Sequence, residues 1–434
     1  MSFRPIALTS VISKLLEKLV KEWRTNHLNR INFLTDCQHG FRSKRSTITC
    51  SLSTNTRINS ILNRSHTVYS VYIDLAKAFD VVPHGHLMNK LISRDVHAPL
   101  LNWLQDFLKN RTLSVEVDEA LSRVMPVTSG VIQGSVIGPL LFIIYMNDLP
   151  EKTVTPDVFI EMYADDTKLY SHSLDNLQTA INMVVDWCDT NKMGLAPLKT
   201  KMIVFSKTRN PPNPSVNICS SSIAPSESTS DLSIQVSRDR KFHLHCLNTA
   251  RKAQRMCGLI MRHLRSKNSD VYAKAFISLI RPILDYASPV WSPHSVQDVN
   301  LLECVQRNFS RRVFRKCKLP PANYASRLNT LGLSTLEERR IRTDFKLTYK
   351  ITRGHIDLAE DVFFRRSIRN SHQPYKLFSA ITPRDDISKF SFANRIVSIW
   401  NALLTNIITS PSMDSFKRNL KNADISHLYT SLIH

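Results

Sequence analysis

Two short runs rich in β-branched and aromatic residues meet at a pair of adjacent carboxylates near the middle of the chain. The runs cover 158–164 and 168–171, and Asp165 and Asp166 lie between them. Such runs favour β-strands, and their closeness predicts a hairpin. Neighbouring side chains on a strand point to opposite faces, so only a tight turn could direct both carboxylates into one region. Aspartate is also common in ordinary turns, so the pair alone leaves a purely structural role open.

The surrounding sequence predicts a mixture of strands and helices. Further strands are expected at 68–75 and 202–205, and a helix is expected at 174–188. Another helix is expected from Ser10, with its apolar residues on one face. That face comprises Ile12, Leu15, Leu16, Leu19, Val20 and Trp23. Strands and helices mixed in this way indicate an α+β domain.

The second half of the chain has a different character. Residues 206–231 are rich in Pro, Ser and Asn, which predicts a linker or long loop. Beyond it, helical patterns are expected at 250–264, 273–284 and 299–314. The sequence therefore predicts that this half is a separate helical region.

The charge balance points to a polyanionic partner. The chain carries 58 Lys and Arg against 36 Asp and Glu, a formal net charge of +22. The excess is concentrated between Arg238 and Lys318, where 17 basic residues face five acidic ones. Each of these side chains could belong to a solvated helix face, but together they predict contacts with phosphate.

The cysteines and the hydropathy indicate in which cellular compartment the protein is expected. The eight cysteines include no CxxC pair and no histidine cluster at zinc spacing, as expected for free thiols in a reducing compartment. No stretch approaches the ~20 apolar residues of a membrane span, and the N-terminus lacks the pattern of a secretory signal. We therefore expect an intracellular protein without a membrane partner.

A third carboxylate follows another predicted strand. The segment from Tyr72 to Asp80 carries Asp74 at the end of a hydrophobic run. Two-metal phosphoryl transfer needs hard oxygen ligands on a rigid platform, and a strand end offers such a platform. Asp74 and Asp165 are 91 positions apart, so only the fold can bring them together. A helix cap is the alternative role of Asp74.

Glycine is unusually concentrated in one loop. The chain has nine glycines, and three of them fall between Gly130 and Gly138. Because glycine lets the backbone approach another group closely, the loop around Gln133 is a candidate binding segment. A structural turn is the alternative.

Taken in order, these segments resemble the reverse transcriptases of non-LTR, LINE-type retrotransposons, and jockey-like elements most of all. The resemblance begins at 4–8, continues through 38–42 with 45–47, and covers 74–80, the 129–139 loop and the 163–166 box Tyr-Ala-Asp-Asp. A further motif matches at 195–201. One such box is weak evidence, whereas several in this order are specific. The C-terminal half resembles the tails of the same elements at 285–291, 400–401 and 416–417.

The resemblance implies roles for individual residues. Asp74 and Asp165 would coordinate two Mg²⁺ ions, with Mn²⁺ as a substitute, and Asp166 would support them. Phe79 would exclude a ribose 2′-hydroxyl, and Gln133 with Gly134 would line the nucleotide pocket. The resemblance further assigns triphosphate contacts to Arg4, a position near the leaving pyrophosphate to Lys199, and nucleic-acid contacts to Arg42 and Arg45.

The resemblance also implies an architecture and partners. The expected right-hand polymerase fold has partial fingers at 1–67, an antiparallel-sheet palm at 68–205 and a loop or linker at 206–231. A basic, thumb-like helical region at 232–318 and a C-terminal helical region at 319–434 follow. The implied partners are an RNA template, a DNA primer and deoxynucleoside triphosphates, in the cytoplasm and nucleus.

Departures from the family pattern keep two other functions open. Ile132 replaces the usual Pro, Ala196 the usual Asn, and Leu232-Ser233 the usual Leu-Gly. An endonuclease and the first part of the fingers would precede residue 4 in a complete element. The alternatives are a decayed remnant that only binds nucleic acid and an RNA-directed RNA polymerase. Phe79 argues against the latter, because an enzyme that uses ribonucleotides needs no bulky gate.

Overall fold

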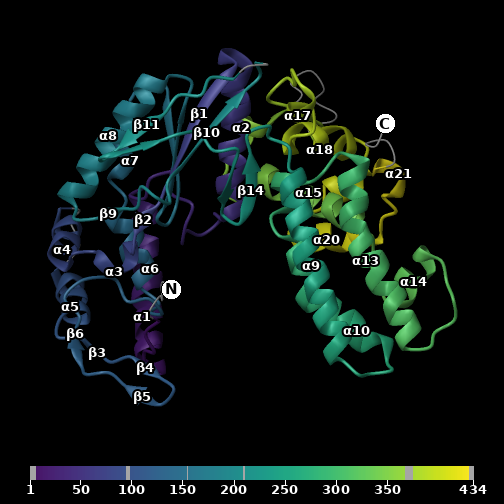
Figure 1. Cartoon of the computed structure of the whole chain (residues 1–434), viewed down its shortest axis with the longest axis horizontal. Coiled ribbons are helices and arrows are strands. Elements are labelled where there is room, and N and C mark those ends of the chain that lie inside the picture. The colour runs from purple at the N-terminus through teal and green to yellow at the C-terminus, as the bar shows by residue number, and fades with distance from the viewer. Residues whose placement is uncertain (1–5, 94–97, 154, 209–210, 367–374, 430–434) are drawn as a thin grey trace. The chain divides into compact units, whose positions relative to one another are not determined.

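The computed structural model describes residues 6–93, 98–153, 155–208, 211–366 and 375–429. The chain forms two compact units, of which the first joins Met1–Ser46 to Ser65–Ser226. The second joins Thr47–Arg64 to Glu227–His434. Helices and strands both occur, and the predicted mixture of the two is confirmed (Figure 1).

The first unit is built on a four-stranded antiparallel sheet. Its strands are β1 (Thr67–Ile73), β7 (Val158–Tyr163), β8 (Asp166–Ser171) and β10 (Lys201–Ser206), in the spatial order β10-β1-β8-β7. All four lie at segments predicted as strands. Every neighbouring pair is antiparallel, so β1 is flanked by strands from two distant parts of the sequence.

Helices bury the apolar side chains of this sheet. From Leu140 to Tyr145 every residue of α6 is buried, and α8, predicted at 174–188, packs its apolar residues into the same core. The helices of the unit are α1 (Val11–Arg30), α3 (Ala78–Val81), α4 (His84–Ile92), α5 (Ala98–Leu108), α6 (Gly138–Tyr145), α7 (Leu149–Lys152) and α8 (Leu174–Thr190). The short strands are β2 (Leu75–Ala76), β3 (Thr112–Leu113), β4 (Glu116–Val117), β5 (Ala120–Leu121), β6 (Met125–Pro126), β9 (Gly194–Leu195), β11 (Val216–Ile218) and β12 (Ser221–Ile223).

Helix α1 exists as predicted, but its apolar face is not the buried one. The side chains of Ile12, Leu15, Leu16, Leu19 and Trp23 are exposed, and only Val20 of the predicted face packs against the core. The opposite face carries the buried residues Glu17, Arg24 and Leu28. A polar anchor therefore sets the orientation of this helix, as the hydrogen bonds of Glu17 described below explain.

The segment expected as a loop or linker, 206–231, contains regular structure. Strand β11 pairs with β12, and Val216 and Ile218 enter the hydrophobic core of the first unit. The hairpin forms although the segment is mostly polar. Burial of the two alternating apolar side chains stabilises it against α8.

The second unit is mostly helical, as expected for the C-terminal half. Helix α13 packs against both α9 and α15 (Figure 1). The helix expected at 273–284 is α10, a π-helical turn and α11 in succession. The elements are α2 (Thr47–Ser65), β13 (Ser228–Asp231), β14 (Ile234–Ser237), α9 (His243–His263), α10 (Ser269–Ala275), η1 (Phe276–Ile280), α11 (Arg281–Asp285), α12 (Ser288–Trp291), α13 (Val296–Lys316), α14 (Tyr324–Thr330), α15 (Leu336–Thr352), α16 (Glu360–Phe363), β15 (Phe364–Arg366), β16 (Leu377–Ser379), α17 (Asp386–Lys389), α18 (Phe392–Asn401), α19 (Thr405–Ile408), α20 (Met413–Asn422) and α21 (Ser426–Tyr429).

Helix α2 belongs to this second unit although it lies early in the sequence. Asn59 accepts a hydrogen bond from Arg240 at 2.6 Å, and the Asn63 carbonyl accepts one from Arg384 at 2.8 Å. Basic side chains that are distant in the sequence thus hold α2 within the second unit.

Candidate active site

The hairpin predicted around Asp165 and Asp166 closes through a two-residue turn. Tyr163 pairs with Asp166, which leaves Ala164 and Asp165 as the turn residues. Ala164 has a φ of 58° and is 5% exposed. A left-handed conformation is unfavourable for alanine, so neighbouring groups must hold this turn in place.

The sheet brings Asp74 to the same end as this turn. Ile73 pairs with Thr167, so the register places the next residue, Asp74, beside Asp166. The Asp74 carbonyl accepts a hydrogen bond from the Ala196 amide at 2.9 Å. The three predicted catalytic carboxylates thus lie at one end of the sheet.

Lys199 lies close to Asp74. Its Nζ is 3.8 Å from Asp74 Oδ1, and the two side chains are 68% and 40% exposed. At that exposure the ion pair contributes little stability. The pair matters by its position, because it puts an exposed cation beside Asp74.

The chemistry of these side chains suits a divalent cation, because carboxylate oxygens are the hard ligands that Mg²⁺ and Mn²⁺ take. Within the described ranges, however, no three Asp, Glu, His or Cys side chains converge closely enough to hold an ion. The strand register therefore brings the three aspartates to one end of the sheet, but their carboxylate oxygens do not surround a common ion position.

Gln38 braces the catalytic turn from the other side. Its Oε1 accepts from the Ala164 amide at 2.9 Å, and its Nε2 donates to the Ala164 carbonyl at 3.2 Å. The same Oε1 accepts from Gly40 at 2.7 Å, and Gln38 is 1% exposed. A Cβ on Gly40 would overlap the Ala164 amide nitrogen. One buried amide thus satisfies both backbone groups of the left-handed residue.

The residues around Gln38 extend this brace along β7. The His39 amide donates to the Met162 carbonyl, and the Met162 amide donates to the Cys37 carbonyl, both at 2.8 Å. His39 Nε2 lies 3.0 Å from Glu161 Oε2 in a buried pair. Burial lowers the pKa of His39, and its hydrogen bond to Glu161 partly opposes that shift.

The glycine-rich loop is fastened to the segment that follows Asp74. Gln133 Nε2 donates to Asp80 Oδ1 at 2.7 Å, and Val131 donates to the Phe79 carbonyl at 2.8 Å. Gly130 has a φ of 90°, and a Cβ there would lie 2.7 Å from the Asp80 carbonyl oxygen. The predicted close approach is therefore between two parts of the chain itself.

Phe79 is held in a fixed position at this junction. Its ring stacks on Phe142 with centroids 4.1 Å apart, and Phe41 contacts its edge at 6.1 Å. The side chain is only partly buried. A ring that is packed between two aromatic neighbours and only partly buried is suited to act as a steric barrier.

Glu17 is a residue of this region that the sequence analysis missed. Its carboxylate is fully buried and accepts from the amides of Val136 and Ile137 at 2.6 and 3.1 Å. These amides precede α6, where a helix favours negative charge. Glu17 thereby anchors α1 to the end of the glycine-rich loop. A lone glutamate in a helical pattern gives no indication of such a partner 119 positions away.

The predicted nucleic-acid contacts Arg42 and Arg45 are engaged within the chain. Arg42 Nη1 donates to the Thr35 carbonyl at 2.5 Å, and Arg45 Nη2 lies 2.7 Å from Asp36 Oδ1. Their side chains are 13% and 5% exposed, so both guanidinium groups brace the Thr35–Gln38 loop. Arg4 lies outside the described residues.

The family model for reverse transcriptase (RNA-dependent DNA polymerase) matches residues 1–257. The chain therefore belongs to the reverse transcriptase family, as its resemblance implied. Asp74, the glycine-rich loop and the hairpin turn all fall within the matched residues.

The chain is also similar to curated polymerases of mobile elements. The chain is 28% identical to a probable RNA-directed DNA polymerase from transposon BS of Drosophila melanogaster, over 85% of this chain and 42% of the relative. It is 27% identical to the RNA-directed DNA polymerase from mobile element jockey of the same species, over 72% of this chain and 35% of the relative. The chain thus spans less than half the length of these relatives.

A solved apo telomerase from Candida tropicalis is 12% identical, over 77% of this chain and 58% of the telomerase, with a TM-score of 0.44. A score below 0.5 does not establish a common fold.

Among the described helices, none is both long and apolar enough to cross a membrane.

Proposed function

We propose that this chain is an RNA-directed DNA polymerase of the non-LTR retrotransposon type. It would add deoxynucleotides to a primer 3′-hydroxyl on an RNA template. The observation that supports this most strongly is the meeting of Asp74, Asp165 and Asp166 at one sheet end within a reverse transcriptase family match. Carboxylates from two distant sequence segments have no need to lie at one end of a sheet for structural reasons alone.

In this proposal Asp74, Asp165 and Asp166 hold two Mg²⁺ ions, or Mn²⁺ in their place. When bound, such a pair of ions stabilises the attacking and leaving oxygens of phosphoryl transfer. The chain itself positions the reactants, which accounts for most of the catalysis in such reactions. Lys199 Nζ lies 3.8 Å from Asp74 Oδ1 and would neutralise charge on the departing pyrophosphate.

The nucleotide would lie against the junction of Phe79 with the glycine-rich loop. The fixed ring of Phe79 would meet the 2′ position of the sugar, where a hydroxyl would clash. Gln133, held by Asp80, and Gly134 would line the pocket. Arg4 would contact the triphosphate.

The proposed architecture is that of a right hand. Partial fingers would occupy 1–67 and the palm 68–205, with the segment 206–231 joining them to a thumb-like region at 232–318 and a C-terminal helical region at 319–434. Exposed basic residues of α9 and α13 would contact the phosphates of template and primer. They include Arg251, Lys252, Arg255, Arg262, Arg311, Arg312 and Arg315. Nucleic-acid contacts of Arg42 and Arg45 stay a prediction.

The test is primer extension on a primed RNA template with deoxynucleotides and Mg²⁺. We expect extension by the wild-type chain and its loss in Asp165→Asn, with Asp186→Asn on the surface of α8 as the matched control. Wild-type protein that binds RNA yet extends no primer would contradict the proposal. It would instead favour a remnant that only binds nucleic acid, as the unconverged carboxylates would allow.

A further inference from the structure

Helix α9 of the second unit carries a glycine that the fold does not require. Gly258 lies in the interior of this 21-residue helix. A Cβ added there would meet no atom within 4 Å beyond the backbone of its own helix, so the position faces open space. Glycine destabilises a helix interior relative to alanine, and no turn or close internal contact requires it here. A partner from outside the chain that approaches the helix backbone closely would account for this residue.

Arginines flank Gly258 on the surface of the unit. Arg255 and Arg262 are exposed, and they lie one turn to either side of Gly258 on the same stripe of α9. Burial raises the pKa of the adjacent Cys257 thiol to about 12, and the charge of Arg312 on α13 opposes this rise. Arg312 therefore lies near the same turn of α9, and it is exposed too. A position without a side chain is thus surrounded by cations from two helices.

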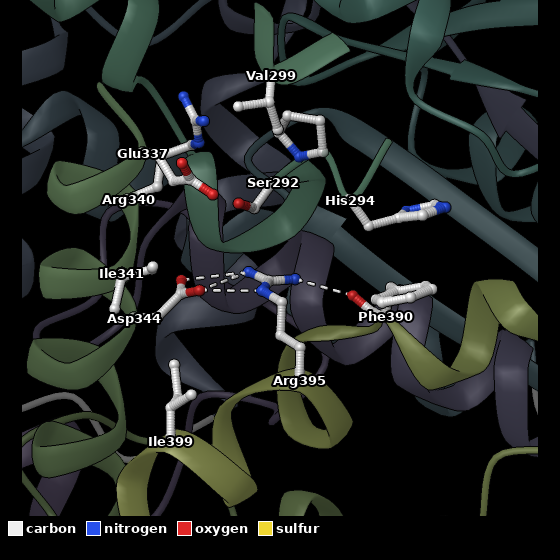
Figure 2. A pocket seen from close by; sticks show the side chains of 11 residues that line it. Ser292, His294, Val299, Glu337, Arg340, Ile341, Asp344, Phe390, Arg395 and Ile399 are labelled. Carbon is white, nitrogen blue, oxygen red and sulfur yellow. Dashed lines mark hydrogen bonds and ion pairs between the residues drawn. The ribbon is translucent and has the colours of Figure 1, made fainter. Parts of the chain in front are cut away.

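These arginines lack acidic partners. Across the described ranges, Arg255, Arg262 and Arg312 make no hydrogen bond or ion pair. By contrast, Arg395 in the pocket drawn in Figure 2 is paired with Asp344, with Nε 2.9 Å from Oδ2. Guanidinium groups form strong, often two-pronged hydrogen bonds with phosphate as well as with carboxylate. The arginines around Gly258 are therefore suited to a phosphate.

The acidic residues of the two helices are engaged elsewhere. Helix α9 contains no Asp or Glu, and α13 contains only Asp298 and Glu303, both in its first half. Glu303 accepts from the Leu336 amide at 2.9 Å, and Asp298 accepts from the Ser295 hydroxyl at 3.0 Å. The arginines beside Gly258 are therefore available to an anion from outside the chain.

A nucleic-acid strand fits both the charge and the missing side chain. Its backbone carries a negative charge at each nucleotide, and much of protein–DNA hydrogen bonding goes to phosphate and sugar. A free phosphate ion would satisfy arginines without needing a bare helix, because a small ion can bind beside a methyl group. A continuous strand that crosses the helix needs the clearance that glycine gives.

We propose that a nucleic-acid strand crosses α9 at Gly258, with its sugar–phosphate backbone against the bare helix. Arg255 and Arg262 would bind phosphates from α9, and Arg312 would bind from α13. A methyl group at the crossing would hold the strand away from these arginines. The inference rests on the proposed function for its choice of nucleic acid as the anion, and it adds a positioning residue to the phosphate contacts of α9 and α13.

The test is Gly258→Ala, whose effects on stability and on binding should have opposite signs. Alanine should raise the urea concentration at the midpoint of unfolding, because it favours the helix. The same change should weaken binding of a short RNA–DNA hybrid to the full chain about tenfold, as expected for the loss of one charge-assisted hydrogen bond. Binding is followed by fluorescence anisotropy, without nucleoside triphosphates.

Two further variants separate the crossing point from general effects. Arg262→Gln should reduce the slope of log K against log salt concentration by about 0.7 to 0.9, the value for one lost phosphate contact. Gly85→Ala makes the same change at another helical glycine that faces open space, in α4. It is the matched control and should keep the wild-type affinity for the hybrid.

Wild-type affinity in Gly258→Ala would overturn the inference. A lower urea midpoint in this variant would also overturn it, because the fold itself would then require the glycine. A full chain that does not bind the hybrid would do the same. Binding is measured without primer extension, so the inference can fail while the proposed polymerase activity holds, and the reverse.

Discussion

Replacing Gln38 tests whether the brace on the catalytic turn matters for the reaction. Gln38→Ala removes two hydrogen bonds to Ala164 and one to Gly40, all of them buried. A buried polar group left unpaired costs about 1–3 kcal/mol. Some of these groups will find water or shift, so we expect a loss of about 3 kcal/mol in the free energy of unfolding of the first unit.

We expect Gln38→Ala to affect the rate of deoxynucleotide incorporation more than it affects stability. Ala164 has a left-handed backbone that only its partners hold, and Asp165 follows it directly. A displacement of about 1 Å at a catalytic group can lower a rate about 10²-fold. We therefore expect the kcat for deoxynucleotide incorporation to fall by about that factor, with a small change in KM.

The assay is steady-state primer extension, with hydrogen exchange of the hairpin measured in parallel. Gln38→Glu keeps both acceptor bonds and loses only the donor to Ala164, so it should recover part of the rate. Gln178→Ala removes a similar pair of hydrogen bonds, between α8 and the Asn217 backbone and away from the catalytic turn, so it is the control and should keep the wild-type kcat. A folded Gln38→Ala protein with the wild-type kcat would refute the reasoning.

Two further predictions concern other parts of the molecule. Phe79→Val should raise incorporation of ribonucleotides relative to deoxynucleotides, and an unchanged sugar preference would show that Phe79 serves only as a packing residue on Phe142. Burial lowers the pKa of His245 to about 4, and its Nδ1 accepts from the Gln235 amide. The unfolded chain, with a histidine pKa near 6.5, then binds the proton more readily. The free energy of unfolding of the second unit should fall by about 3 kcal/mol as pH drops from about 6.5 to 4, and His245→Gln should remove most of this slope in urea titrations.

The local sequence pattern was enough to predict the strands and helices, but it did not predict which face of a helix is buried. The strands β1, β7, β8 and β10 were evident from β-branched and aromatic runs. By contrast, the apolar face predicted for α1 is largely exposed, while Glu17 on the other face is buried and accepts hydrogen bonds from the amides before α6. A periodic pattern shows which residues share a face, but it does not show which face finds a polar partner.

In the candidate site, too, the sequence indicated the residue types but not the contacts that position them. The approach of Asp74 to the Asp165 turn follows from strand register, which no spacing in the sequence could supply. The brace by Gln38 and the anchor by Glu17 depend on partners 126 and 119 positions away. Arg42 and Arg45 bond to their own loop, which no spacing in the sequence indicated, and their contacts with nucleic acid stay a prediction.

The central claim is that the carboxylates of this chain copy RNA into DNA. The most direct measurement is to sequence the product made from all four deoxynucleotides on a primed RNA of known sequence. We expect DNA complementary to the template with wild-type protein, and no product with Asp74→Asn. Absence of product from folded, RNA-binding wild-type protein, or extension that ignores the template, would contradict it.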